Sequence, residues 1–285
     1  MIKELRVNFY RIFRTKSFYV IFGVILAFAL LSSFFIFFLA DDPTGFMEGF
    51  TSALDEQLIV ASTESDDEEE QKSQELVQEY FDNMASSNQP TGVLSMLWSE
   101  FSVFLMAVFV ALFVGGEFKS RFHINRFSLN TGRSMIFFCE WLALAIVGFL
   151  VMVISTIVGI ALTILFCSNF YWGDLGSFCV KFFLSYLCLL VFMTFAFMIA
   201  VFRRASALSI VLSSLYIFEV FHLVYGIVSI LNSLILEFSV NNIFTNVYGR
   251  TLTSNDVFAY SFFLLGYIFA FLGITIGVSN YRDAC

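Results

Sequence analysis

The stretch SFYVIFGVILAFALLSSFFIFFLA, residues 17–40, runs for 24 positions without a charged side chain. About 20 apolar residues in a helix cross the hydrocarbon core of a bilayer. The stretch is therefore long enough to span a membrane by itself. The basic residues before it are spread from Lys3 to Lys16, and Phe38 stands where a cleavable signal peptide needs a small residue. We expect a retained membrane anchor at this position.

The rest of the chain repeats this apolar character. Of its 285 residues 59% are hydrophobic and only 13% are charged, whereas a soluble domain carries about 25% charged residues. This much apolar surface needs lipid as part of its solvent. The sequence predicts an all-α, polytopic integral membrane protein with six spans. The expected spans are residues 18–40, 93–114, 134–167, 178–202, 205–231 and 257–280.

Lys and Arg are distributed unequally between the segments that connect the spans. Twelve of the 15 fall on one side of the expected membrane, and the other side has only Lys72, Lys181 and Arg250. Positive loops stay in the cytoplasm. We therefore place residues 1–17, 115–133, 203–204 and 281–285 in the cytoplasm and residues 41–92, 168–177 and 232–256 outside. A bacterial plasma membrane is the natural setting for this organisation.

The N-terminal segment 1–17 has two different faces when it is drawn as a helix. One face is apolar, and most of the basic residues lie opposite it. The apolar residues are Ile2, Leu5, Phe9, Ile12 and Phe13, and the basic residues are Lys3, Arg6, Arg11 and Arg14. This pattern predicts an elbow helix lying on anionic lipid before the first span. An ordinary positive-inside anchor is the alternative.

The outer segment 41–92 holds most of the acidic residues. Its most acidic run is Asp66, Asp67, Glu68, Glu69 and Glu70. Ser65 and Glu68 form a capping box, and apolar residues recur on both sides at helical spacing, so we expect a helical hairpin. Two copies would cap a central path, and their negative charge would concentrate cationic solutes. The alternative is a solvated charge run that aids only solubility and topology.

The cytoplasmic loop GGEFKSRFHINRFSLNTGR, residues 115–133, mixes aromatic and basic side chains. Aromatic anchors among charges are typical of a short helix that docks in a groove on another protein. The alternative is a basic loop resting on lipid headgroups. The candidate docking residues are Glu117, Phe118, Lys119, Arg121, Phe122 and Arg126.

Polar residues within the expected spans are few. Glu219 lies in the middle of the fifth span, and His222 follows on the same helical face. A carboxylate at that depth is costly, so the pair is a candidate for the substrate path or a proton relay. The alternative is a neutral Glu that forms a hydrogen bond across a subunit contact. Glu140 lies near the inner end of the third span, within reach of Arg133. The apolar, Asn-rich segment 232–256 fits a re-entrant or interfacial helical pair.

No motif of a catalytic or metal site occurs in the sequence. It has no phosphate-binding loop, no dinucleotide fingerprint, no H-E-x-x-H and no G-x-S-x-G. Its five Cys and two His lack metal-site spacing. Cys167 and Cys179 either form a disulfide outside the cell or are plain apolar residues at helix ends. We expect no catalytic residue, cofactor or metal in this chain, and the net charge of −8 argues against nucleic acid as a partner.

These features together resemble the permease subunits of ABC-2-type ATP-binding-cassette exporters. The most specific local match is Glu117-Phe118-Lys119-Ser120, followed by Gly132-Arg133 before an apolar span. In that family the loop forms a coupling helix that fits a groove on the ATPase. The chain departs from the pattern at Arg121-Phe122, where Gly-Thr is usual, and at Glu140, near where many members have Lys.

The resemblance implies the partners. Two separate ATPase subunits would bind ATP and Mg, and a second permease copy would complete a homodimer or heterodimer. The acidic outer segment is similar to that of bacterial exporters of phenol-soluble modulins and of lantibiotic self-protection permeases, which implies an amphipathic peptide as substrate. Three alternatives remain open: a proton-coupled carrier using Glu219, a membrane sensor or assembly protein without transport, and an ABC-2 exporter of drugs or lipid-linked glycans.

Overall fold

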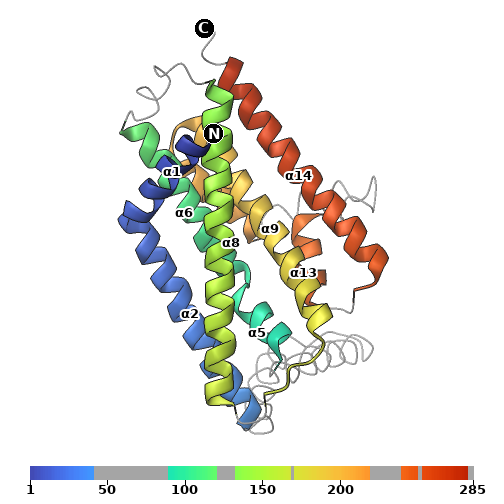
Figure 1. Cartoon of the computed structure of the whole chain (residues 1–285). Coiled ribbons are helices and arrows are strands. Elements are labelled where there is room, and N and C mark those ends of the chain that lie inside the picture. The colour runs from blue at the N-terminus through green and yellow to red at the C-terminus, as the bar shows by residue number, and fades with distance from the viewer. Residues whose placement is uncertain (42–88, 121–131, 168–169, 219–238, 250–251, 282–285) are drawn as a thin grey trace, which may run out of the picture. The chain divides into compact units, whose positions relative to one another are not determined.

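The structure is a computed structural model that describes residues 1–41, 89–120, 132–167, 170–218, 239–249 and 252–281. These residues form nine α-helices (Figure 1). Five of the nine are long and apolar enough to cross a membrane: α2 (Lys16–Asp41), α6 (Glu100–Lys119), α8 (Arg133–Phe166), α9 (Leu175–Arg203) and α14 (Ser254–Tyr281). The shorter ones are α1 (Ile2–Arg14), α5 (Pro90–Leu97), α10 (Ser206–Ile217) and α13 (Val240–Gly249).

The expected all-α class is confirmed, and the five long helices indicate an integral membrane protein. The expected fifth span, residues 205–231, is represented only by the short helix α10, because residues 219–238 lie outside the described part of the chain. The sixth crossing therefore stays a prediction.

The expected second span differs from the structure. It is divided into α5 and α6 at Trp98 and Ser99. Ser99 has extended backbone (φ −66°, ψ 172°), and its carbonyl accepts the amides of Ser102 (3.1 Å) and Val103 (3.3 Å), so a new helix begins there. The acidic Glu100 stands in the first turn, where the helix dipole favours a negative charge. At its other end α6 continues to Lys119, past the expected end at residue 114.

The chain divides into two compact units. The larger unit comprises residues 1–27, 98–155 and 179–285, and the smaller unit comprises residues 28–97 and 156–178. Most of α9 is buried at the centre of the larger unit. Trp141 donates a hydrogen bond from Nε1 to Oγ1 of Thr194 (2.9 Å), and the hydroxyl of Tyr186 donates to the carbonyl of Ala145 (3.1 Å). These part-buried side-chain bonds join α8 to α9.

A tight turn joins α9 to α10 in the larger unit. Arg204 has a φ of 53°, which lies in the left-handed region of backbone conformation that residues other than glycine rarely adopt. The hydroxyl of Ser209 then donates to the carbonyl of Ala196 (2.7 Å), which holds the two helices together. Beyond the turn α10 packs on α6, and an added Cβ on Gly115 would lie only 2.6 Å from Cβ of Ser206. Small residues thus allow the two backbones to approach closely.

In the smaller unit, polar side chains join α2 to α8. The Ser33 hydroxyl donates to the carbonyl of Gly159 (3.1 Å) and accepts a bond from Oγ1 of Thr163 (3.3 Å). Val93 of α5 packs beside Gly159, and an apolar cluster forms from Ile36, Val93 and Cys167. Cys167 is a buried free thiol, and Cys179 of the larger unit is an exposed free thiol. The structure therefore does not contain the disulfide considered from the sequence.

The helix α14 exposes most of its surface, which includes Phe258, Phe262 and Phe269. A Cβ added to Gly273 or Gly277, the G-x-x-x-G of this helix, would meet no atom within 4 Å among the described residues. Exposed phenylalanines on a long apolar helix are suited to contact with lipid tails.

Candidate functional site at the basic end of the larger unit

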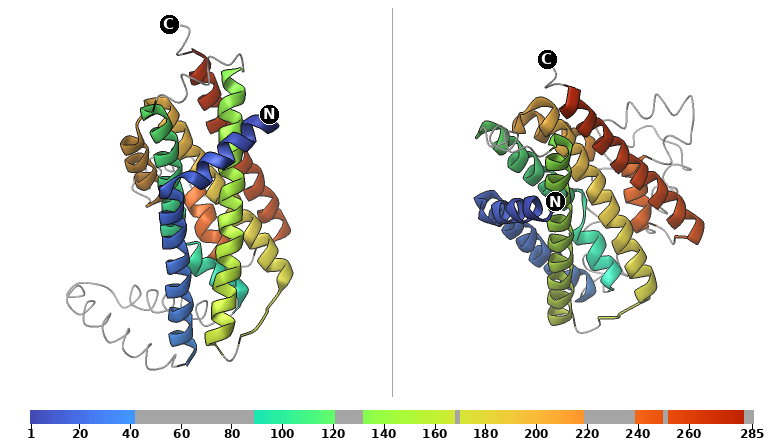
Figure 2. Two further views of the ribbon diagram at one scale, coloured as in Figure 1. Left: turned by 60° about the vertical axis from the view of Figure 1, so that its left-hand side comes forward. Right: turned by 45° about the horizontal axis from the view of Figure 1, so that its top comes forward.

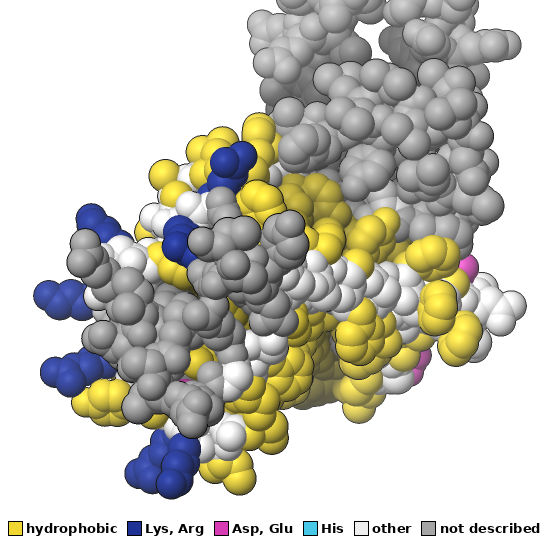
Figure 3. Space-filling model, turned by 90° about the horizontal axis from the view of Figure 1, so that it is seen from above, with side chains coloured by type: hydrophobic (Ala, Val, Ile, Leu, Met, Phe, Trp, Pro, Cys, Tyr) yellow, Lys and Arg dark blue, Asp and Glu magenta, His cyan; other side chains and the backbone are white. Residues whose placement is uncertain are grey.

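Basic side chains gather at the end of the larger unit where α1 lies and where α6 and α9 terminate. We call this the basic end, and Figure 3 looks onto it. Its described Lys and Arg side chains are all exposed except that of Arg11, which is half-buried. They are Lys3, Arg6, Arg11, Arg14, Lys16, Lys119, Arg203 and Arg204. Their concentration fits the charge asymmetry from which the topology is predicted.

The helix α1 packs on the protein with one face and leaves another open. It meets α2 at a steep angle (Figure 2), because Thr15 between them has extended backbone. Asn8 and Ile12 are fully buried, whereas Ile2 is 78% exposed and Phe13 is 43% exposed. The apolar face expected from the sequence is therefore shared between protein contacts and a surface available to lipid.

A buried ion pair ties α1 to the end of α6. Arg11 of α1 pairs with Glu117 in the last turn of α6, and Glu117 is only 3% exposed. The guanidinium also lies 5.5 Å from the centre of the Phe113 ring, within cation–π distance. Removing one member of a buried pair costs about 3–5 kcal/mol, because the other charge is left without compensation. The pair therefore holds α1 firmly against α6.

The candidate docking residues do not all face outward. Glu117 points into the protein, and the half-buried Phe118 packs on Phe137 with ring centres 6.4 Å apart. Lys119 is exposed at the end of α6. Ser120 ends the helix, with its hydroxyl donating to the carbonyl of Glu117 (3.1 Å). Arg121, Phe122 and Arg126 lie outside the described residues.

An open cavity of about 320 Å³ lies between α1 and the end of α6. A Cβ added to Gly116 would meet no atom of the described part of the chain within 4 Å, so this glycine helps to leave the space open. The lining residues are Arg11, Arg14, Thr15, Leu112, Phe113, Gly116, Glu117 and Ser120. The sequence did not predict this cavity, because the elbow helix and the loop that form it lie about 100 residues apart in the chain. The one signal in the sequence was the position of Arg11, which lies at helical spacing from the buried Asn8 and the half-buried Thr15.

The other candidate residues give less information. Glu219, His222 and the acidic run Asp66 to Glu70 lie outside the described residues. Glu140 of α8 is fully buried. The side chain of Arg133 lies outside the described part, so the expected pairing of Glu140 with Arg133 stays a prediction.

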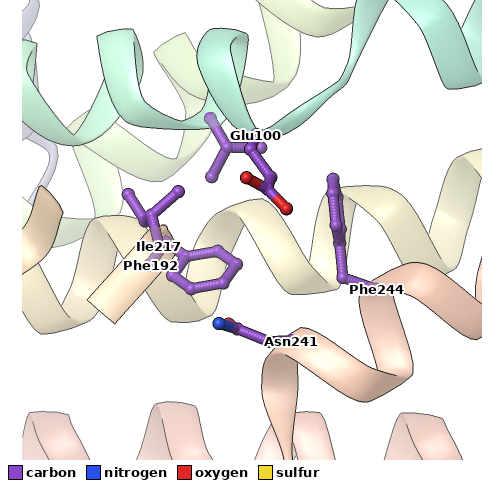
Figure 4. A pocket seen from close by; sticks show the side chains of 6 residues that line it. Glu100, Phe192, Ile217, Asn241 and Phe244 are labelled. Atoms are coloured by element: carbon purple, nitrogen blue, oxygen red, sulfur yellow. The ribbon is translucent and has the colours of Figure 1, made fainter. Parts of the chain in front are cut away.

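A second recess lies where α13 meets α9, α10 and the start of α6. Figure 4 shows the carboxylate of Glu100 directed towards the space between Phe192 and Phe244. The recess is too narrow for a water molecule. Asn241 donates from Nδ2 to the carbonyl of Tyr216 (3.0 Å), a carbonyl in the last turn of α10. This region is therefore a packed contact between α13 and the helices α6, α9 and α10 rather than a binding cavity.

A further contact joins α13 to α9, where the hydroxyl of Tyr248 donates to Oγ of Ser185 (2.6 Å). Burial raises the pKa of Tyr248 above its ordinary value, so the hydroxyl stays protonated at physiological pH. The two contacts of α13 join the segment expected to re-enter the membrane to α9 and α10.

Among the described residues, no group of His, Cys, Asp and Glu could hold a metal ion. No family model, no curated protein and no solved structure matches this chain.

Proposed function

We propose that the chain is the membrane-spanning permease subunit of an ABC-2-type exporter, driven by two separate ATPase subunits that bind ATP and Mg. The observation that carries the proposal is the buried pair between Arg11 and Glu117. It joins the elbow helix to α6 immediately before the loop that resembles a coupling helix. A force on that loop would therefore act on α1 and α6 together.

The proposed topology has six spans and both termini in the cytoplasm of a bacterium. Two termini on one side require an even number of crossings. Because α9 ends in a tight turn and α10 packs back on α6, α10 starts a further crossing. Its 12 residues rise about 18 Å, short of the roughly 30 Å of a bilayer core. Residues 219–238 would complete the crossing.

The proposed mechanism is a rigid-body switch. Closure of the ATPases around ATP would displace the loop after Lys119 and, through the ion pair, the elbow helix. Paired with a second copy, the chain would then alternate between inward-open and outward-open states. The substrate would be an amphipathic peptide, since the aromatic-rich helices offer an apolar path and Glu219, His222 and the acidic outer segment supply negative or titratable groups.

The experiment that tests the proposal is a pull-down of the tagged chain from host membranes in mild detergent, with ATPase activity assayed in the eluate. The test variant is Lys119→Glu combined with Phe122→Asp. Phe118 is left intact, because its ring packs inside the protein. Lys3→Glu, an exposed charge reversal on α1, is the matched control.

We expect an ATPase to co-purify with the native chain and the control and to be lost several-fold in the double variant. Absence of any nucleotide-hydrolysing partner, or equal recovery with all three chains, would reject the exporter and leave the carrier or the sensor. Glu219→Gln would then separate these two, since it abolishes flux only in a carrier.

A further inference from the structure

The cavity at the basic end has an unbalanced positive charge. Among the described residues two guanidinium groups line it, those of Arg11 and Arg14, and one carboxylate, that of Glu117. The carboxylate is engaged by Arg11. Arg14 is exposed and donates to the hydroxyl of Tyr10 (2.9 Å), a neutral group. The cavity therefore keeps about one unit of positive charge, held by Arg14.

The position of the cavity matches the headgroup layer of a bilayer. Its residues come from the last turn of α1 and the end of α6, next to Lys16, where the first long apolar helix begins. Basic residues directly before a spanning helix lie at the level of lipid phosphates. The lining of the cavity also includes the partly exposed Leu112, which offers apolar surface to the first carbons of an acyl chain.

The size and openness of the cavity suit a headgroup. A cavity of only about 10–15 Å³ holds a single water molecule, whereas this cavity measures about 320 Å³. It therefore has room for a group much larger than water. Arg14, Gly116 and Ser120 on its lining are exposed, so the cavity is open to its surroundings. The Ser120 hydroxyl can rotate towards an oxygen atom of a bound headgroup. Gly116 has no side chain, which leaves room for that headgroup.

We propose that this cavity binds the phosphate group of an anionic phospholipid, with Arg14 as its main charged contact. Arg–phosphate pairs are among the stronger charge-assisted hydrogen bonds. A zwitterionic lipid would also bring an ammonium group, and among the described lining residues the one carboxylate, that of Glu117, is already paired with Arg11. The site should therefore prefer phosphatidylglycerol to phosphatidylcholine. This inference goes beyond the proposed export function and does not depend on an ATPase.

Two variants test the charge and the space separately. Arg14→Gln removes the positive charge. Gly116→Leu keeps both arginines and occupies part of the cavity, and its Cβ meets no neighbour among the described residues. The matched controls are Arg203→Gln, another exposed arginine of the basic end, and Gly23→Leu on α2, where a Cβ also meets nothing.

The measurement is the amount of each lipid that stays bound after purification from mixed phosphatidylglycerol and phosphatidylcholine micelles, read by native mass spectrometry. We expect phosphatidylglycerol to be retained by the native chain and both controls and to fall several-fold in both test variants. Equal retention of the two lipids, or equal loss in test and control variants, would overturn the proposal.

A second arm distinguishes a lipid from a free anion. Excess inorganic phosphate is added before the measurement. A lipid held by both its phosphate and its chains stays bound, which supports the proposal. Complete displacement of the lipid by inorganic phosphate would overturn it and assign the cavity to a small anion. Melting temperatures no lower than that of the native chain show that the variants are folded.

Discussion

Adjacent glycines near the end of α6 differ sharply in their surroundings. A Cβ on Gly115 would lie within 2.8 Å of the Ser206 backbone, whereas a Cβ on Gly116 would meet nothing. Gly115→Ala should therefore force α10 away and lower the free energy of unfolding by about 1–3 kcal/mol. Gly116→Ala gains only helix propensity and should raise it by up to about 1 kcal/mol. Melting temperatures in detergent check the difference, and equal shifts would contradict the close approach of α6 and α10.

The ion pair of Arg11 and Glu117 lends itself to a double-mutant cycle. Arg11→Met should lower the free energy of unfolding by about 3–5 kcal/mol, because it removes the cation paired with the buried carboxylate of Glu117. Glu117→Leu should lower it by less, because the half-buried Arg11 keeps some contact with water. The double variant should be more stable than either single variant, since both charges are gone. Denaturation in mixed micelles measures the coupling. Additive losses would show that the two residues do not stabilise each other.

Individual residues of the candidate site could be predicted only in part. The aromatic and basic pattern of the sequence identified Phe118 and Lys119, and the structure leaves Lys119 exposed. The inward position of Glu117 could not be predicted, because its partner Arg11 lies in a distant part of the sequence. Local patterns show which residues share a helix face, whereas a contact between helices depends on packing that no local pattern records.

At the scale of an element, the turn from α9 to α10 requires a left-handed backbone conformation at Arg204. Arg204 has a φ of 53°, a conformation that costs a residue with a Cβ about 1–2 kcal/mol. Arg204→Gly should remove this cost, and Arg204→Val should increase it because the side chain is β-branched. Both variants lose the same charge, so the difference between their melting temperatures reports the backbone. A valine variant as stable as the glycine variant would contradict the turn geometry.

Helix ends followed from hydropathy where a span is uninterrupted. The bounds of α2, α8, α9 and α14 lie within three positions of the expected ones. The break between α5 and α6 was not predicted, since the residues on both sides of it are apolar. Ser99 followed by Glu100 is a sequence typical of a helix start, and giving it more weight would have located the break.

For the whole molecule, the number of crossings decides the location of the C-terminus. With the N-terminus in the cytoplasm, as proposed, six crossings place the C-terminus there too, whereas the five long helices alone would leave the C-terminus outside. A reporter pair fused to the C-terminus, fluorescent only inside the cell or enzymatically active only outside it, measures this directly. We expect fluorescence without outer enzyme activity. The opposite result would exclude a crossing completed by residues 219–238.

The acidic outer segment gives a prediction about substrates. Replacing Asp66, Asp67, Glu68, Glu69 and Glu70 by Asn or Gln should reduce export of cationic peptides more than export of neutral ones, because a negative surface raises the local concentration of cations. Export is measured as peptide released from cells that produce each kind. Equal effects on both peptides would show that the acidic run does not attract the substrate.

The burial of Glu117 also has a consequence for cells in changing surroundings. Dissolved ions weaken attractions between charges in contact with water and scarcely reach those enclosed by protein. Because this carboxylate is 3% exposed, and because the proposed topology places α1 in the cytoplasm, the attachment of α1 to α6 should persist when the cytoplasm becomes more saline under osmotic stress. Contacts of the exposed arginines with lipid would weaken under the same stress, so the elbow would loosen from the membrane surface before it separates from the protein.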